Sequence, residues 1–71
     1  MEFEWVDGFA IRVSVDGGAV LVSANREGML SLANHLAALA QGESGDHFHL
    51  DEHDSLEEGS NELVIELADE P

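Results

Sequence analysis

The sequence predicts an α+β fold in which one antiparallel-rich sheet of four to five strands carries a single helix on one face. Apolar residues alternate with a period of two on both sides of the chain's centre, which is typical of half-buried strands. Between these segments the apolar period becomes helical, and glycines punctuate the connections. The predicted order is β-β-β-α-β-β. With 71 residues, the chain can support one core, so residues 1–71 form a single domain.

Residues 9–24 predict a β-hairpin with one apolar face. The apolar positions of its first half are Phe9, Ile11, Val13 and Val15. A turn at Gly17-Gly18 sets Val15 opposite Val20, whereas a turn at Asp16-Gly17 shifts the pairing by two and buries the same face. Glu2 to Val6 predicts an additional edge strand with Phe3 and Trp5 on one side.

A helix is predicted from Arg26 to Gln41. Asn25 is a favourable N-cap, Glu27 lies in the first turn where an acid suits the helix dipole, and Gly42 follows the last turn. The stripe expected to pack on the sheet is Met29, Leu32, Ala33, Leu36, Leu39 and Ala40. Ser31, Asn34, Ala38 and Gln41 are expected to face outward, with His35 near the exposed face.

Two further strands are predicted at His47–Asp51 and Glu62–Leu67. Phe48 and Leu50 of the first, and Leu63, Ile65 and Leu67 of the second, are expected to point inward. Pairing Leu50 with Leu63 and Phe48 with Ile65 keeps these faces together.

The charge excludes several classes of partner. The net charge is −14, and Glu43 to Pro71 contains eleven acidic residues and no Lys or Arg. Such a field repels nucleic acid and anionic membranes and attracts basic proteins. Cysteine is absent, and neither a signal peptide nor a long apolar run is present, so a cytoplasmic protein is expected. The small core gives an incentive to form a homodimer.

The residues provide no convincing catalytic set, so no enzyme and no cofactor are predicted. Cys, Lys and Tyr are absent, and Ser31 and His35 have no Asp to orient the imidazole. The run from His47 to His53 comes one residue from the His-x-His-x-Asp-His pattern of metallo-hydrolases but has Glu52 where histidine is needed. No metal site is therefore predicted, although a small metal- or ligand-binding protein using His47, His49 and Asp51 stays the alternative.

The outward face of the His47–Asp51 strand and the acids after it form the candidate partner-binding surface, because the other face is expected to be covered by the helix. Its residues are His47, His49, Asp51, Glu52, Asp54, Glu57 and Glu58.

Three segments carry a resemblance to a known family. They are Ser23 to Leu36 (SANREGMLSLANHL), Asp46 to Glu52 (DHFHLDE) and Gly59 to Glu66 (GSNELVIE). Together they resemble the immunity protein 32 family of bacterial polymorphic toxin systems, over roughly residues 9 to 67. The resemblance implies a small α+β protein that binds and neutralises a cognate toxin in the producing cell. If that toxin is a nuclease, its basic cleft would suit an acidic protein. A third hypothesis for the function is that the protein is a regulatory or structural module of a larger acidic assembly.

Overall fold

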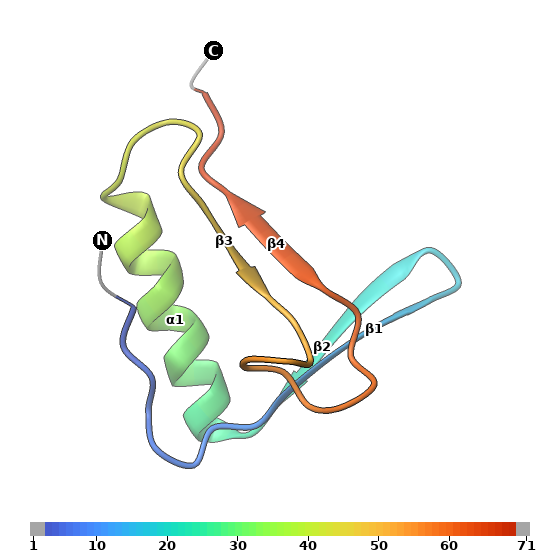
Figure 1. The fold of residues 1–71 in the computed structure, drawn as a ribbon. Coiled ribbons are helices and arrows are strands. Elements are labelled where there is room, and N and C mark those ends of the chain that lie inside the picture. Colours follow the sequence, from blue (N-terminus) through green and yellow to red (C-terminus); the bar gives the residue numbers. More distant parts are fainter. Residues whose placement is uncertain (1–2, 70–71) are drawn as a thin grey trace.

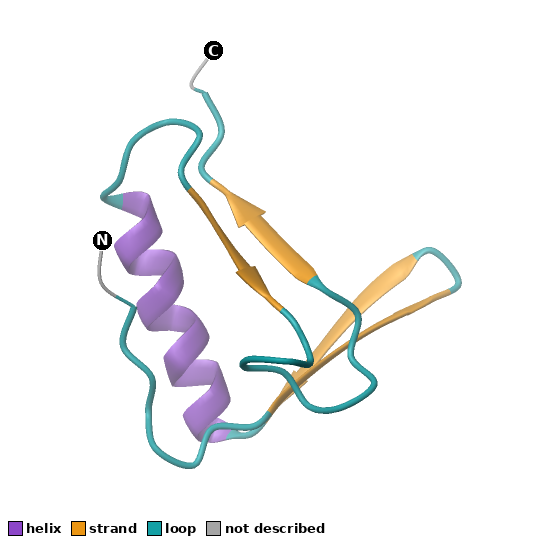
Figure 2. Ribbon diagram, in the orientation of Figure 1, coloured by secondary structure: helices purple, strands orange, loops and turns teal. Residues whose placement is uncertain are grey.

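The computed structural model describes residues 3–69 and has the element order ββαββ. Its elements are β1 (Ile11–Asp16), β2 (Ala19–Ala24), α1 (Arg26–Ala40), β3 (His47–Leu50) and β4 (Leu63–Glu66). The strands form two separate two-stranded antiparallel sheets, β1-β2 and β3-β4 (Figures 1 and 2). The α+β class and the single helix are confirmed, whereas the prediction of one sheet with four to five strands is wrong.

A loop, rather than a strand, occupies the second edge of β1. We call residues 51–62 the acidic loop. Its Glu57 N–H donates to the carbonyl of Ile11 at 2.8 Å, and its Asn61 N–H donates to the carbonyl of Val13 at 2.8 Å. The N–H of Val13 donates to Ser60 Oγ at 3.1 Å. Because these bonds satisfy the edge of β1 without a regular ladder, the two hairpins pack together but do not share a sheet.

Both predicted hairpin registers are confirmed. Val15 lies opposite Val20 across a turn in which Gly17 and Gly18 have φ angles of 58° and 84°, so the Gly17-Gly18 alternative is the one adopted. In the second hairpin Phe48 lies opposite Ile65 and Leu50 opposite Leu63. In both hairpins, therefore, the alternation of apolar residues correctly predicted which residues of the two strands lie opposite each other.

The predicted N-terminal strand is wrong for the residues that the structure describes. Glu2 lies outside them, and residues 3–6 form no strand. This segment instead bonds to helix side chains. The N–H of Val6 donates to Ser31 Oγ at 2.8 Å, and Asn34 Nδ2 donates to the carbonyl of Glu4 at 3.4 Å. Its backbone is therefore held along α1 and not along a strand.

The predicted start of the helix is confirmed, and its end lies one residue before the predicted Gln41. Asn25 is the N-cap, and its Oδ1 accepts a hydrogen bond of 2.8 Å from Gly28 N–H. The helix ends at Ala40, with Gln41 as the C-cap and Gly42 after it. This helix is too short and not apolar enough to cross a membrane, and no other helix occurs in residues 3–69.

Most of the predicted inward face of the helix is wrong, although Leu32 packs against the core as expected. Leu39 is buried as expected, but the other buried helix residues are Gly28, Ser31 and His35, while Met29 and Leu36 are each 49% exposed. Close approach of β1 requires a glycine, because a Cβ on Gly28 would lie 2.7 Å from the carbonyl oxygen of Ala10. Ser31 Oγ donates to the carbonyl of Glu27 at 2.8 Å, so its hydroxyl is satisfied inside the protein.

The hydrophobic core draws on both hairpins, the helix and the acidic loop. Its buried residues are Ile11, Val13, Leu39, Phe48, Leu50 and Leu56. Leu56 belongs to the acidic loop, so burial of this side chain anchors a segment that otherwise carries charges. The loop is thus part of the folded unit.

Candidate partner-binding surface

The first half of the acidic loop is held by hydrogen bonds centred on Asp51. Its carbonyl accepts from the N–H groups of Ser55 at 3.1 Å and Leu56 at 2.9 Å. Its carboxylate oxygen Oδ1 accepts from the N–H of His53 at 2.9 Å. Asp51 is half-buried. Both its carbonyl and its carboxylate bind backbone N–H groups of the turn at residues 51–56, so this residue shapes the first half of the loop.

Asp54 is the acid whose ionised form is most clearly favoured. The hydroxyl of Ser55 donates to its Oδ1 at 2.6 Å, and the N–H of Asp51 donates to the same oxygen at 3.2 Å. The Ser55 hydrogen bond, followed by that from Asp51, lowers the pKa of Asp54 below its ordinary value. The exposed carboxylate at this position stays negative at every physiological pH.

The second half of the acidic loop is closed by Glu52 and Gly59. Glu52 Oε2 accepts a 2.7 Å hydrogen bond from Gly59 N–H, and Gly59 has a positive φ of 88°. Arg12 Nη1 reaches the carbonyl of Glu58 at 3.2 Å, so this arginine supports the loop backbone. Glu57 and Glu58 remain exposed on this fixed backbone. The loop therefore presents carboxylates in a preorganised arrangement.

His47 and His49 lie on the exposed face of β3, as predicted. Their ring centroids are 4.9 Å apart. His49 Nδ1 lies 3.2 Å from Glu62 Oε2, a contact that links this face to the end of the acidic loop. Sequence reasoning missed Glu62. The register could have identified it, because Glu62 lies diagonally across from His49 when Leu50 pairs with Leu63.

The structure does not assemble His47, His49 and Asp51 into a metal site. Among residues 3–69, no group of three or more His, Asp or Glu side chains is placed to hold a metal ion. His47 Nδ1 lies 3.2 Å from the carbonyl of Gly45, and the carboxylate of Asp51 is used by the N–H of His53. The two imidazoles share a face, but the carboxylate belongs to the loop turn.

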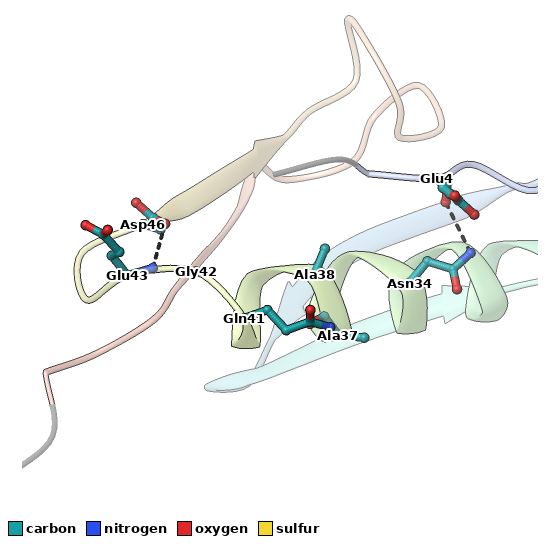
Figure 3. Close-up of a pocket in the computed structure, with 8 residues that line it drawn as sticks. All are labelled: Glu4, Asn34, Ala37, Ala38, Gln41, Gly42, Glu43 and Asp46. Carbon is teal, nitrogen blue, oxygen red and sulfur yellow. Dashed lines mark hydrogen bonds between the residues drawn. The ribbon is translucent and has the colours of Figure 1, made fainter.

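A shallow polar hollow lies beside the C-terminal half of α1 (Figure 3). It is lined by Glu4, Asn34, Ala37, Ala38, Gln41, Gly42, Glu43 and Asp46. Asp46 Oδ2 accepts a 2.8 Å hydrogen bond from Glu43 N–H, so this carboxylate closes the connection after the helix. The hollow adds acidic groups to the surface and offers no nucleophile.

A second, mostly apolar hollow borders β3 and contains His35, which sequence reasoning placed near the exposed face. Its lining includes Phe3, Trp5, Phe48 and Asp54. His35 is only 1% exposed, and its Nδ1 lies 2.7 Å from the carbonyl of Ser31. The sequence carries no signal of this burial, because polar residues one helical turn apart, such as Ser31 and His35, are typical of an exposed helix face.

The fold and this surface define a class, that of small α+β proteins in which an acidic loop is held by hydrogen bonds to the edge of a β-hairpin. A family model described as Immunity protein 32 matches residues 19–68. The chain belongs to the immunity protein 32 family, which has a role in toxin systems and whose members are generally not enzymes. Searches of curated proteins and of solved structures gave no match.

Proposed function

We propose that this protein neutralises a basic cognate toxin by binding it, without catalysis, through the acidic loop and the exposed histidine face of β3. The observation that carries the proposal is the exposure of Glu57 and Glu58 on a loop that is bonded to β1 and anchored by buried Leu56. A loop already held in one shape loses little conformational entropy on binding.

Charge supports a basic partner. The chain carries a net charge of −14, and its C-terminal part from Glu43 has no Lys or Arg to offset the acids. Complementary charge steers encounter and can raise association rates to about 10⁸–10⁹ M⁻¹s⁻¹ at low salt. A toxin with a basic substrate cleft, such as a nuclease, is the partner that this field attracts best. The bacterial cytoplasm is the compartment in which such an inhibitor protects its producer.

Charge reversal in the acidic loop tests the surface. In the double variant Glu57→Lys and Glu58→Lys, association with the cognate toxin at low salt should slow by at least about tenfold, because the steering field is reversed where the toxin docks. Stopped-flow kinetics measures the rate, and circular dichroism checks the fold.

A matched control changes the net charge equally at another place. Asp7 and Glu43 are exposed acids outside the acidic loop, and replacing both with Lys alters the total charge by the same amount. This control should have a smaller effect on the rate. Equal slowing by both double variants would mean that only the total charge matters and would exclude the acidic loop as the docking surface.

The alternative function, metal binding through His47, His49 and Asp51, makes a separate prediction. We expect no stoichiometric zinc, because the Asp51 carboxylate is committed to the N–H of His53 and zinc sites need three or four ligands in place. Elemental analysis of protein purified without a metal-affinity step measures this. One equivalent of zinc that survives dialysis would favour the alternative.

A further inference from the structure

On the edge of β2 that faces away from β1, the backbone groups have no hydrogen-bond partner among residues 3–69. Asn25 N–H donates to the carbonyl of Ala10 at 3.1 Å, so the backbone groups of Ala10 and Asn25 point towards each other one residue beyond the strand ends. Hydrogen-bonded pairs alternate along an antiparallel ladder, so the backbone groups of Leu21 point towards β1 and those of Val20 and Val22 point away. Outside the regular strand ladder, no backbone bond to Val20 or Val22 occurs within residues 3–69.

The same alternation accounts for the other side of this hairpin. On β1, the carbonyls of Ile11 and Val13 point away from β2, and both are taken by N–H groups of the acidic loop. The order across the hairpin is therefore acidic loop, β1 and β2, and no described part of the chain pairs with the outer edge of β2. One edge of the hairpin is covered and the other is open.

The sequence of β2 does not protect this open edge. Natural edge strands commonly carry charges, prolines or bulges that prevent pairing with another chain. The strand from Ala19 to Ala24 reads AVLVSA and has no charge or proline, in a chain with sixteen acidic residues. Val20 and Leu21 are each 60% exposed, and they lie on opposite faces of the strand. In Figure 1 the hairpin extends away from α1, and the exposure of Val20 and Leu21 shows that both of its faces reach solvent near the turn.

We propose that β2 is a homodimer interface, at which the β2 strands of two copies of this chain pair antiparallel to form a continuous four-stranded sheet. A two-fold axis beside Leu21 sets Leu21 of one copy opposite Leu21 of the other and pairs Val20 with Val22. The backbone groups of Val20 and Val22 then bond across the interface, and the apolar faces of the two hairpins stay on the same side of the sheet.

Charge identifies a second copy, and not the basic toxin, as the occupant. Residues 8–26 contain two arginines and one aspartate, so this part of the chain has none of the acidic excess found elsewhere. A basic toxin is attracted to the acidic loop, which lies beyond β1 on the opposite edge of the hairpin. The uncharged β2 presents nothing that repels an identical strand. Pairing through β2 therefore leaves both acidic loops accessible.

Salt should separate the two interactions. Each copy brings a net charge of −14, so long-range repulsion opposes dimerisation and salt weakens this repulsion. The dimer should therefore become tighter as salt is added, while association with a basic toxin becomes slower. Sedimentation velocity over a concentration series, at physiological and at high salt, measures the dimer directly. A protein that stays monomeric throughout both series would overturn the inference.

Two substitutions place the interface. Leu21→Lys should raise the dimer dissociation constant by at least about tenfold, because it sets two like charges opposite each other at the axis. The control is Leu30→Lys on α1, the same chemical change at a residue that is 55% exposed. It should leave the dimer nearly as tight as in the wild type. Equal weakening by both variants would exclude β2 as the interface.

A backbone test complements the charge test. Val20→Pro removes an N–H that points away from β1, so it should block strand pairing without the loss of a hydrogen bond inside the hairpin. Val20→Thr retains the N–H and should still dimerise. In the wild type, hydrogen exchange at the amides of Val20 and Val22 should slow as protein concentration rises. Exchange that is independent of concentration in a sample shown to be dimeric would place the interface elsewhere.

Association with the toxin and dimerisation can be measured separately in the same variants. Leu21→Lys should weaken dimerisation and retain rapid association with the toxin, whereas the Glu57→Lys and Glu58→Lys double variant should retain dimerisation and associate slowly with the toxin. Loss of toxin association in Leu21→Lys, with an intact fold, would identify the toxin as the occupant of β2 and would contradict the pairing of two copies.

Discussion

The imidazole of His35 stacks on the ring of Phe3, with centroids 4.6 Å apart and planes 7° from parallel. Trp5 approaches the same imidazole edge-on at 4.2 Å, and Phe48 does so at 5.4 Å. These rings come from the N-terminal segment and from β3, so His35 connects both of these parts of the chain to α1. Buried aromatic contacts of this kind contribute beyond the area that they bury.

Replacing His35 should therefore cost more stability than replacing its apolar neighbour. We expect His35→Ala to lower the free energy of unfolding by about 2–4 kcal/mol, because it leaves a cavity among three aromatic rings. Leu36→Ala, at a half-exposed position, should cost under about 1 kcal/mol. Urea unfolding followed by circular dichroism measures both. A larger loss for Leu36→Ala would contradict the helix orientation described above.

Gly28→Ala should destabilise the protein even though alanine favours helices. A Cβ at this position would lie 2.7 Å from the carbonyl oxygen of Ala10 and 2.9 Å from Ala24 Cβ. Overpacking of this kind costs about 1–3 kcal/mol, which exceeds the gain of about 1 kcal/mol in helix propensity. The control Ala37→Gly, at an exposed helix position, should cost about 1 kcal/mol. Thermal melting compares them, and a raised melting temperature in Gly28→Ala would refute the close approach.

Ser55→Ala should raise the pKa of Asp54 towards its ordinary value, because it removes the strongest hydrogen bond to the carboxylate. The pKa of Asp54 is lowered in the folded state, so its contribution to stability is present above the unfolded value of about 3.9 and is lost as the pH falls through the lower folded value. The variant should lose this contribution at a higher pH than the wild type. An NMR titration of the Asp54 carboxyl carbon measures the change, and an unaltered pKa would show that Ser55 does not hold it.

Added salt should raise the melting temperature. Within residues 3–69 the imidazole–carboxylate contacts are His49 with Glu62 and His53 with Glu52, and no arginine there forms an ion pair with a carboxylate. Repulsion among the acids is therefore largely uncompensated, and salt screens it over a Debye length of about 8–10 Å at physiological strength. The Glu57→Lys and Glu58→Lys double variant should show a weaker dependence. A wild-type melting temperature that falls with salt would indicate acids that are paired or that bind a cation.

The sequence by itself determined the elements that depend on local chemistry. Alternation in the two hairpins specified which residues pair, because a shift by one residue would turn every apolar side chain to the opposite face. Asn25 defined the start of the helix through its side-chain hydrogen bond to Gly28. The acidic C-terminal part was evident from composition alone. The resemblance of the chain to the immunity protein 32 family is confirmed by the family match over residues 19–68.

Only the tertiary structure decided how these elements meet. Hydrophobicity favoured the Met29 and Leu36 side of α1, but the buried side is the one on which Gly28 admits β1 and Ser31 and His35 find hydrogen-bond partners. The edge of β1 could have taken another strand and instead accepts the acidic loop. These outcomes depend on partners distant in sequence, since buried polar groups and strand edges must be satisfied by whatever the complete fold brings to them.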